Sequence, residues 1–228
     1  MMEWANRYGA DLIQAIITHL YYVLIPVALG FVIAVILGVL LSRVPKISGY
    51  ILPVLSVFQT IPGIVFVGIL FLYVGMVPAT VLIALTIYAV FPILKNTYVG
   101  LLNVDEKVKE AARGCGMSPL QILIKIELPL AMPNIFVGLR LSTIYTVSWA
   151  VLAAMIGLGG LGDFIYRGVG TNNNMLILTG AIPAAILALS LGALVDWIQK
   201  RLTPRGLDRK STRLNSSHFL LSRMPSSA

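Results

Sequence analysis

The sequence predicts an all-α fold, a polytopic bundle of membrane helices, and two observations carry this prediction. Of the 228 residues, 58% are hydrophobic and only 11% are charged, whereas a soluble domain carries roughly 25% charged residues. Four long stretches, 20–42, 47–94, 141–162 and 168–195, contain no Asp, Glu, Lys or Arg. A helix that crosses a bilayer needs about 20 apolar residues. The composition therefore excludes a soluble enzyme, a disordered segment and a disulfide scaffold.

Five membrane spans are predicted after an N-terminal interfacial segment over residues 1–19, which lacks the basic start of a cleaved signal peptide and is expected to be retained. His19, at the border of the first span, is expected at the interface. The stretch 47–94 holds two spans, and Pro62 and Gly63 are predicted to break the first of these, so six spans are the alternative count. The predicted spans lie at about 20–42, 50–74, 78–100, 129–156 and 175–198.

Small residues recur at helical spacing in the first and last spans. They are Gly30, Ala34 and Gly38, and then Gly180, Ala184, Ala188 and Gly192. Small residues let the backbones of membrane helices approach closely. We expect packing within the bundle, and the alternative is a seam between two copies.

The positions of Lys and Arg predict the orientation. With five spans and the N-terminus outside, one side collects Arg43, Lys46, Lys95, Lys107, Lys109, Arg113, Lys125, Lys200, Arg201 and Arg205. The other side keeps only Arg7 and Arg167. Basic residues favour the cytoplasmic side, so the N-terminus is predicted outside and the C-terminus inside. The net charge of +8 thus follows from topology and indicates no nucleic-acid partner.

Two further features limit the functional interpretation. Residues 208–228 are rich in serine and have no apolar period, and they resemble translated sequencing-adapter sequence, so this tail is predicted to be non-native. The transmembrane domain is therefore assigned to residues 20–207. Cys115 is the single cysteine, which excludes an intrachain disulfide and predicts no metal site.

The loop over residues 103–128 carries the most specific pattern. Opposite charges lie three or four residues apart in three pairs: Asp105 with Lys109, Glu106 with Lys109, and Glu110 with Arg113. Such pairs predict a short exposed helix. Gly114 and Gly116 are expected to end it, and Pro119 is expected to begin a second short helix.

The same loop contains a motif with two spacings: Glu110-Ala111-Ala112, three residues, Gly116, nine residues, then Ile126, Leu128 and Pro129. The motif resembles the coupling loop of binding-protein-dependent ABC importer permeases of the methionine-permease-like fold. The resemblance implies that the loop docks into a groove of a cytoplasmic ATPase subunit. Ala111 and Ala112 would allow close approach, Glu110 would offer an acceptor, and Gly116 would form the turn. The alternative is an ordinary solvated helix.

Other segments narrow the resemblance. They are Ile156–Ile165, Gly180–Pro183, Arg201–Leu207 and Phe58–Pro62, and they resemble the osmoprotectant branch, whose solutes are glycine betaine, carnitine, choline and proline betaine. Methionine and related amino-acid permeases share the Gly-Gly-Leu-Gly part, so amino-acid import is the alternative. The resemblance implies a multi-pass subunit of a prokaryotic cytoplasmic membrane. Its partners would be an ATPase, an extracytoplasmic binding protein and a second permease, identical or paralogous.

The chain itself is predicted not to be an enzyme. It contains no Gly-x-x-x-x-Gly-Lys-Ser/Thr motif, so ATP and Mg²⁺ would bind to the partner ATPase and this chain would hold no cofactor. A secondary transporter or channel is the rival class. It is disfavoured because the predicted spans offer no buried acid for an ion relay.

A glycine-rich segment follows the fourth span. Its residues are Gly157, Gly159, Gly160, Gly162 and Asp163. The resemblance implies that this segment contributes to an outer gate and meets the binding protein, and the alternative is a plain connector.

Polar and aromatic residues in the fourth span are candidates for a pathway. Ser142, Tyr145 and Trp149 lie at i, i+3 and i+7, and aromatic faces attract trimethylammonium cations. Helix packing is the alternative. Arg140 is either functional or extended toward the cytoplasmic interface. Asp196, one turn before Lys200, predicts a local ion pair.

Overall fold

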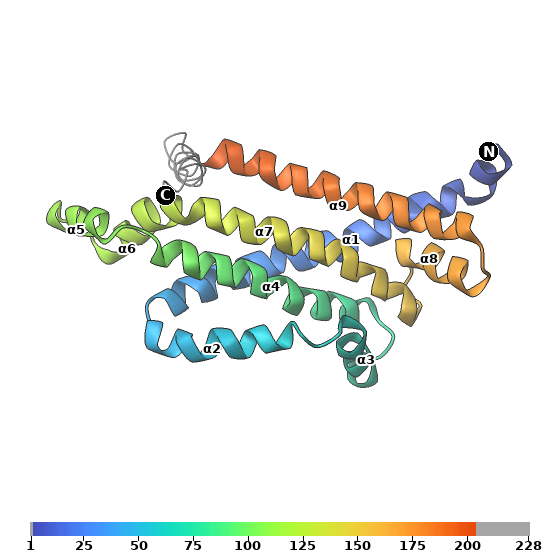
Figure 1. Cartoon of the computed structure of the whole chain (residues 1–228), viewed down its shortest axis with the longest axis horizontal. Coiled ribbons are helices and arrows are strands. Elements are labelled where there is room, and N and C mark those ends of the chain that lie inside the picture. The colour runs from blue at the N-terminus through green and yellow to red at the C-terminus, as the bar shows by residue number, and fades with distance from the viewer. Residues whose placement is uncertain (1, 204–228) are drawn as a thin grey trace, which may run out of the picture.

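The computed structural model describes residues 2–203, and this part of the chain is helical without strands (Figure 1). The helices are α1 (Met2–Ser42), α2 (Pro45–Phe58), α3 (Gly63–Val74), α4 (Pro78–Leu102), α5 (Glu106–Gly114), α6 (Pro119–Ile122), α7 (Leu128–Ala150), α8 (Leu161–Gly170) and α9 (Asn174–Leu202). A π-helical turn (Leu123–Glu127) precedes α7, and a 3-10 turn (Val151–Ile156) follows it. The predicted all-α membrane fold is confirmed. The predicted non-native tail, 208–228, and the last four residues of Arg201–Leu207 lie outside the described residues.

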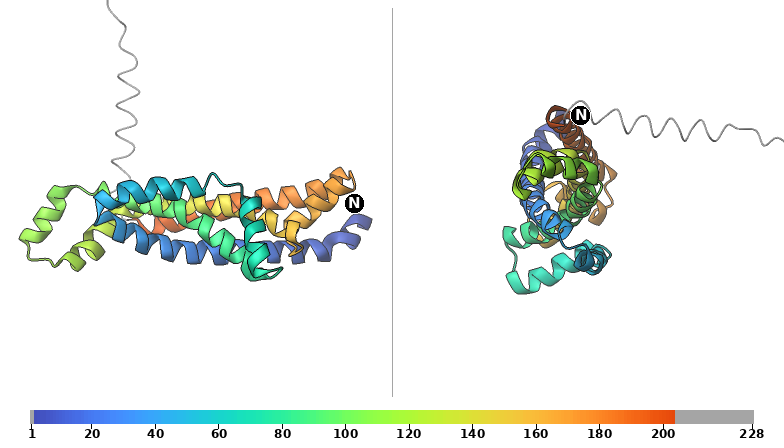
Figure 2. Two further views of the ribbon diagram at one scale, coloured as in Figure 1. Left: turned by 90° about the horizontal axis from the view of Figure 1, so that it is seen from below. Right: turned by 90° about the vertical axis from the view of Figure 1, so that its left-hand side faces the viewer.

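Four helical stretches are long and apolar enough to cross a membrane: Tyr8–Ser42, Pro78–Leu102, Pro119–Ile156 and Asn174–Leu202. They run alongside one another in Figures 1 and 2, with α4 packed against both α1 and α7 and with α9 against α7. The predicted interfacial segment and first span form one continuous helix, α1. No helix-breaking residue separates them, and Pro26 is accommodated within the helix.

The second predicted span is broken, as the sequence indicated. α2 and α3 meet at an angle of 87°, and Pro62, which has no N–H to donate, lies at the break with ψ of 130°. At 1.5 Å per residue, these helices of 14 and 12 residues reach about 21 and 18 Å, which is short of a hydrocarbon core of about 30 Å. Neither half is long enough to cross alone, so the pair forms either one broken span, which would be the fifth, or a re-entrant loop, and the six-span alternative is not supported.

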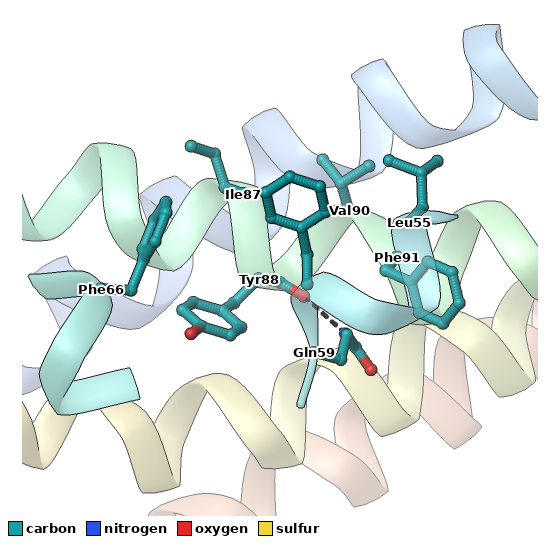
Figure 3. A pocket seen from close by; sticks show the side chains of 8 residues that line it. Leu55, Gln59, Phe66, Ile87, Tyr88, Val90 and Phe91 are labelled. Carbon is teal, nitrogen blue, oxygen red and sulfur yellow. Dashed lines mark hydrogen bonds between the residues drawn. The ribbon is translucent and has the colours of Figure 1, made fainter. Parts of the chain in front are cut away.

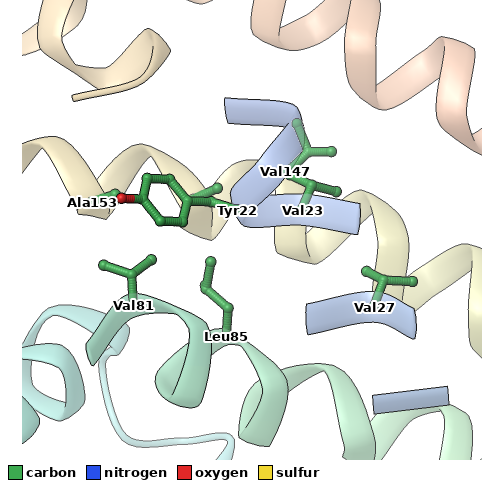
Figure 4. Close-up of a cluster of buried hydrophobic side chains, with 8 residues drawn as sticks. Tyr22, Val23, Val27, Val81, Leu85, Val147 and Ala153 are labelled. Carbon is green, nitrogen blue, oxygen red and sulfur yellow. The ribbon is translucent and has the colours of Figure 1, made fainter. Parts of the chain in front are cut away.

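A buried cluster joins α1, the first turns of α4, the end of α7 and the 3-10 turn, toward the end of the bundle that carries α8 (Figure 4). Its members are Tyr22, Val23, Val27, Val81, Leu85, Val147, Ala150 and Ala153. Lipid is as apolar as these side chains, so close packing rather than the hydrophobic effect holds membrane helices together.

Glycines provide that close packing. A Cβ added at Gly30 would lie 3.0 Å from the Cβ of Ala89, and one at Gly38 would lie 2.7 Å from Cγ2 of Thr97. The small residues of the first span therefore face α4 of the same chain, as packing within the bundle predicts. In the last span, a Cβ at Gly180 would lie 2.6 Å from the carbonyl oxygen of Leu161 at the start of α8.

The two ends of the bundle differ. The loop that contains α5 and α6 projects beyond one end, near the C-terminal end of α9 (Figures 1 and 2). α8 and the N-terminal part of α1 lie at the opposite end. The fold thus separates the predicted coupling loop from the predicted gate segment by the full length of the spans.

Candidate functional site

α5 forms because its ends are capped. Asp105 precedes the helix, and its Oδ1 accepts a hydrogen bond of 3.0 Å from the backbone N–H of Lys107. Glu106 lies in the first turn and Arg113 in the last, where their charges oppose the helix dipole. The predicted short exposed helix is confirmed, although it starts at Glu106.

The ion pairs of α5 converge on one carboxylate. Glu106 accepts from Nζ of Lys109 at 2.7 Å and from Nη1 of Arg113 at 2.9 Å. These hydrogen bonds, first that from Lys109 and then that from Arg113, lower the pKa of Glu106. The predicted pairs of Asp105 with Lys109 and of Glu110 with Arg113 are wrong. Asp105 serves as the helix cap instead, and Arg113 reaches back two turns to Glu106.

The turn between α5 and α6 depends on Gly116. Its φ is +77°, and the N–H groups of Gly116 and Met117 donate to the carbonyls of Arg113 and Ala112. This is the Schellman arrangement, in which the left-handed position favours glycine. α6 then begins with a capping box, in which Ser118 and Gln121 each bond the other's backbone N–H. Gly114, the other predicted terminator, is the last residue of α5.

The motif residues divide into an exposed and a packed set. Glu110, Ala111 and Gly116 are exposed at the tip, whereas Ala112 is buried within this chain, so only Ala111 of the two alanines is open to a partner. The residues at the root are partly buried where the loop enters α7: Ile126, Leu128 and Pro129.

An ion pair that the sequence did not indicate lies at the root of the loop. Glu127 is buried at the end of the π-helical turn, and both of its oxygens accept from the guanidinium of Arg43, just after α1. The Nη1–Oε1 distance is 3.1 Å. Paired hydrogen bonds of this kind fix orientation as well as charge. The loop is thus tied to the first span as well as to α7.

The glycine-rich segment has the backbone that its composition predicts. Gly157, Gly159 and Gly160 have φ of +74°, +75° and +89°, which is the region where side chains are strained. A Cβ at Gly162 would lie 3.0 Å from that of Ala154, so α8 packs closely on the 3-10 turn. Asp163 pairs with Arg167 at 3.3 Å.

His19 lies next to Gly160 of this segment and is buried within the bundle. The side chain is fully buried, and Nε2 donates to the carbonyl oxygen of Val147 in α7 at 3.1 Å. Its Nδ1 has no hydrogen-bond partner in the described part of the chain, and a Cβ at Gly160 would lie 3.6 Å from it. The histidine therefore links α1, α7 and the glycine-rich segment.

The three candidate pathway residues do not share one environment. Ser142 is buried and donates to the carbonyl oxygen of Ala89 at 2.8 Å. Trp149 is partly buried and packs edge-on against Tyr88 of α4, with ring centroids 4.0 Å apart. Tyr145 is exposed. Serine and tryptophan thus face α4, while the tyrosine points out of the bundle.

Arg140 forms an ion pair with an acidic residue of α9. Its Nε lies 3.2 Å from Oδ1 of Asp196 in α9, and both side chains are about half exposed. The predicted local pair of Asp196 with Lys200 is replaced by this contact between helices. Within residues 2–203, no group of three or more His, Cys, Asp or Glu residues is placed to hold a metal ion.

Comparisons with known proteins agree with this architecture. Residues 7–206 match the family described as binding-protein-dependent transport system inner membrane component. The chain is 42% identical over 209 residues to the carnitine transport permease protein OpuCB of Listeria monocytogenes, covering 91% of this chain and 95% of that protein. It is 39% identical over 211 residues to the choline transport system permease protein OpuBB of Bacillus subtilis, covering 92% and 96%.

The fold is also that of a solved ABC permease. The chain superposes on an inward-facing structure of the MetNI methionine ABC transporter with a TM-score of 0.76 at 23% sequence identity, covering 85% of this chain and 96% of that one. The family match, the alignments with the two relatives and the structural superposition each cover most of the described bundle. The chain therefore belongs to the binding-protein-dependent transport system inner membrane components, the permease subunits of ABC importers.

Proposed function

We propose that this permease imports quaternary ammonium osmoprotectants such as glycine betaine, carnitine, choline and proline betaine, driven by ATP hydrolysis on a separate subunit. The names of the two relatives, carnitine and choline permeases at 42% and 39% identity, support this solute class. The alternative, import of methionine or another amino acid, has less support, because the chain shares only 23% sequence identity with the methionine transporter.

The observation that carries ATP coupling is the projecting loop. The loop with α5 and α6 projects beyond the end of the bundle (Figure 1), and Val108 is exposed on α5. Leu120 and Ile124, at the start of the stretch Pro119–Ile156, are also exposed. Exposed apolar side chains on a projecting loop favour a protein partner. With Glu110 and Ala111 exposed on the same loop, this surface suits docking into a groove of the ATPase subunit. That subunit would hold ATP and Mg²⁺.

The root of the loop suits transmission of movement. The π-helical turn leads without a break into α7, and the Arg43–Glu127 pair ties it to α1. A displacement of α5 and α6 would therefore move two spans as a rigid body. ATP binding would bring the loops of two permease subunits together and open the pathway outward, and hydrolysis would reset the inward-open state.

The proposed orientation in the membrane follows from what lies at the two ends of the bundle. Docking to the ATPase puts the loop and the C-terminal end of α9 in the cytoplasm, and α8 and the N-terminus outside. The Gly157–Gly162 segment, with Asp163, then faces the extracytoplasmic binding protein and serves as part of the outer gate. A second permease subunit, identical or paralogous, completes the pathway in the prokaryotic cytoplasmic membrane.

The test is uptake of radiolabelled glycine betaine by proteoliposomes. They would hold the chain without residues 208–228 together with its ATPase, partner permease and binding protein. We expect ATP-dependent uptake that excess carnitine and choline block and methionine does not. Uptake of methionine instead would overturn the solute class. Uptake without ATP would overturn the importer mechanism in favour of a secondary transporter or channel.

The role of the loop has its own test. Gly116→Pro and Glu110→Lys are expected to abolish or weaken association with the ATPase subunit and to stop uptake. Association and uptake at the wild-type level in both variants would contradict the docking role.

A further inference from the structure

An aromatic pocket lies beside the break of the second span (Figure 3). Phe58 and Gln59 at the end of α2, Phe66 in α3, and Tyr88 and Phe91 in α4 line it, with aliphatic side chains between them. None of its lining residues is charged. Tyr88 and Phe91 lie near the middle of α4, so the pocket is at mid-depth of the bundle.

Two of the rings of this pocket, those of Tyr88 and Phe66, are held by contacts within the bundle. Tyr88 is buried, and its hydroxyl donates to the carbonyl oxygen of Ile61 at 2.8 Å. Phe66 meets Tyr88 edge-on at 5.4 Å between centroids, and Trp149 meets it at 4.0 Å. Gln59 Nε2 donates to the carbonyl oxygen of Tyr88 at 3.3 Å. A prearranged wall of rings loses little conformational entropy when a ligand binds.

The electrostatics of the pocket favour a cation. The faces of aromatic rings carry partial negative charge. α2 ends at Phe58, so its C-terminal carbonyls, the negative end of the helix dipole, lie at the same place. Broken membrane helices commonly direct such ends at transported ions.

The chemistry further selects the kind of cation. A metal ion or a primary ammonium would lose hydrating water in this pocket without gaining carboxylate ligands, which is costly. A quaternary ammonium has no N–H to satisfy and is bound by ring faces. The pocket therefore matches a methylated ammonium group better than any other small cation.

We propose that this aromatic pocket is a transmembrane binding site for the quaternary ammonium group of the transported solute. The inference rests on the proposed function and deepens it, because it puts a solute site within the permease itself. Trp149, one of the predicted pathway residues, contributes by packing edge-on against Tyr88, whereas Tyr145 is exposed.

The first experiment measures ATP-dependent choline uptake by the complete transporter in proteoliposomes. Phe91→Leu and Phe66→Leu each remove a ring but keep an apolar side chain. We expect uptake at subsaturating choline to fall about three- to thirtyfold. Phe91→Tyr keeps a ring and is expected to restore uptake. Phe71→Leu, in α3 but outside the pocket, is the matched control.

The second experiment measures binding of radiolabelled choline to the solubilised permease–ATPase complex without the binding protein. Choline itself should compete strongly, and 3,3-dimethylbutanol, its uncharged isostere, should compete weakly. Equal competition by the isostere would indicate an apolar cavity for a lipid chain and would overturn the proposal. If the wild type takes up choline and both leucine variants take it up at the same rate, the proposal is also wrong. Failure of the wild type to take up choline and glycine betaine would instead refute the proposed function.

Discussion

Arg43 and Glu127 lie 84 positions apart in the sequence, and their side chains form a two-point ion pair at the root of the coupling loop. The carboxylate is buried and the guanidinium is half exposed. The pair holds the end of α1 against the turn that leads into α7. A contact at this point joins the loop to both α1 and α7.

Glu127→Gln is expected to lower the free energy of unfolding by about 1–3 kcal/mol, because it leaves the guanidinium without its counter-charge. ATP hydrolysis should then continue while uptake falls. The measurement is the thermal midpoint of the solubilised subunit, together with the ratio of solute taken up to ATP hydrolysed. Glu110→Gln, at an exposed position of the same loop, is the control and should leave the midpoint unchanged. An unchanged midpoint in Glu127→Gln would show that the pair is dispensable.

Gly138 is predicted to be intolerant of any side chain. A Cβ there would lie 2.8 Å from the carbonyl oxygen of Pro92 and 2.9 Å from Cα of Ile93, so α4 and α7 would have to separate. Gly138→Ala should cost about 1–3 kcal/mol of stability, seen as a lower thermal midpoint. Gly68→Ala in α3, where nothing lies within 4 Å, should not lower it. Equal midpoints for the two variants would refute the close contact.

Gly116 and Gly114 offer a matched pair within the loop. Gly116→Ala forces a side chain into a left-handed conformation at a cost of about 1 kcal/mol or more, which should weaken binding to the ATPase subunit about fivefold or more. Gly114→Ala lies in a helix with open space around it and should bind normally. Binding of both variants with wild-type affinity, measured by co-purification or calorimetry, would argue against a role for the turn.

The lowered pKa of Glu106 predicts that the stability of the loop depends on pH in the acidic range. Its folded pKa lies below the ordinary value of 4.5, so its contribution to loop stability is complete above that value. The contribution is lost as the pH falls through the lowered folded pKa. A carboxyl ¹³C NMR titration, assigned with Glu106→Gln, should give a midpoint below 4.5. Lys109→Gln removes the main hydrogen bond and should raise the midpoint, and no change in this variant would contradict the assigned cause.

The sequence predicted those features that local composition controls. The spans, the break at Pro62, the helix over 106–114 and the turn at Gly116 all follow from hydropathy, from a residue without an N–H, or from backbone conformation at one position. The structure confirms them, because apolar helices and turns depend on residues that are adjacent in the chain. The ion pairs within α5 were less predictable. Side chains of one short helix have several possible partners within reach, and Arg113 pairs with Glu106 and not with Glu110.

The backbone of the loop and the apolar helical segments were therefore determined by the sequence alone, whereas contacts between side chains of different helices were decided only by the tertiary structure. Burial of His19 against Val147, the pairing of Arg140 with Asp196, and the convergence of Phe66, Tyr88 and Trp149 each depend on how helices far apart in the chain are packed. Lipid-facing and protein-facing surfaces of a membrane helix are equally apolar. The linear pattern thus shows which segments cross the membrane, and the close approach of backbones at glycines determines which side chains meet.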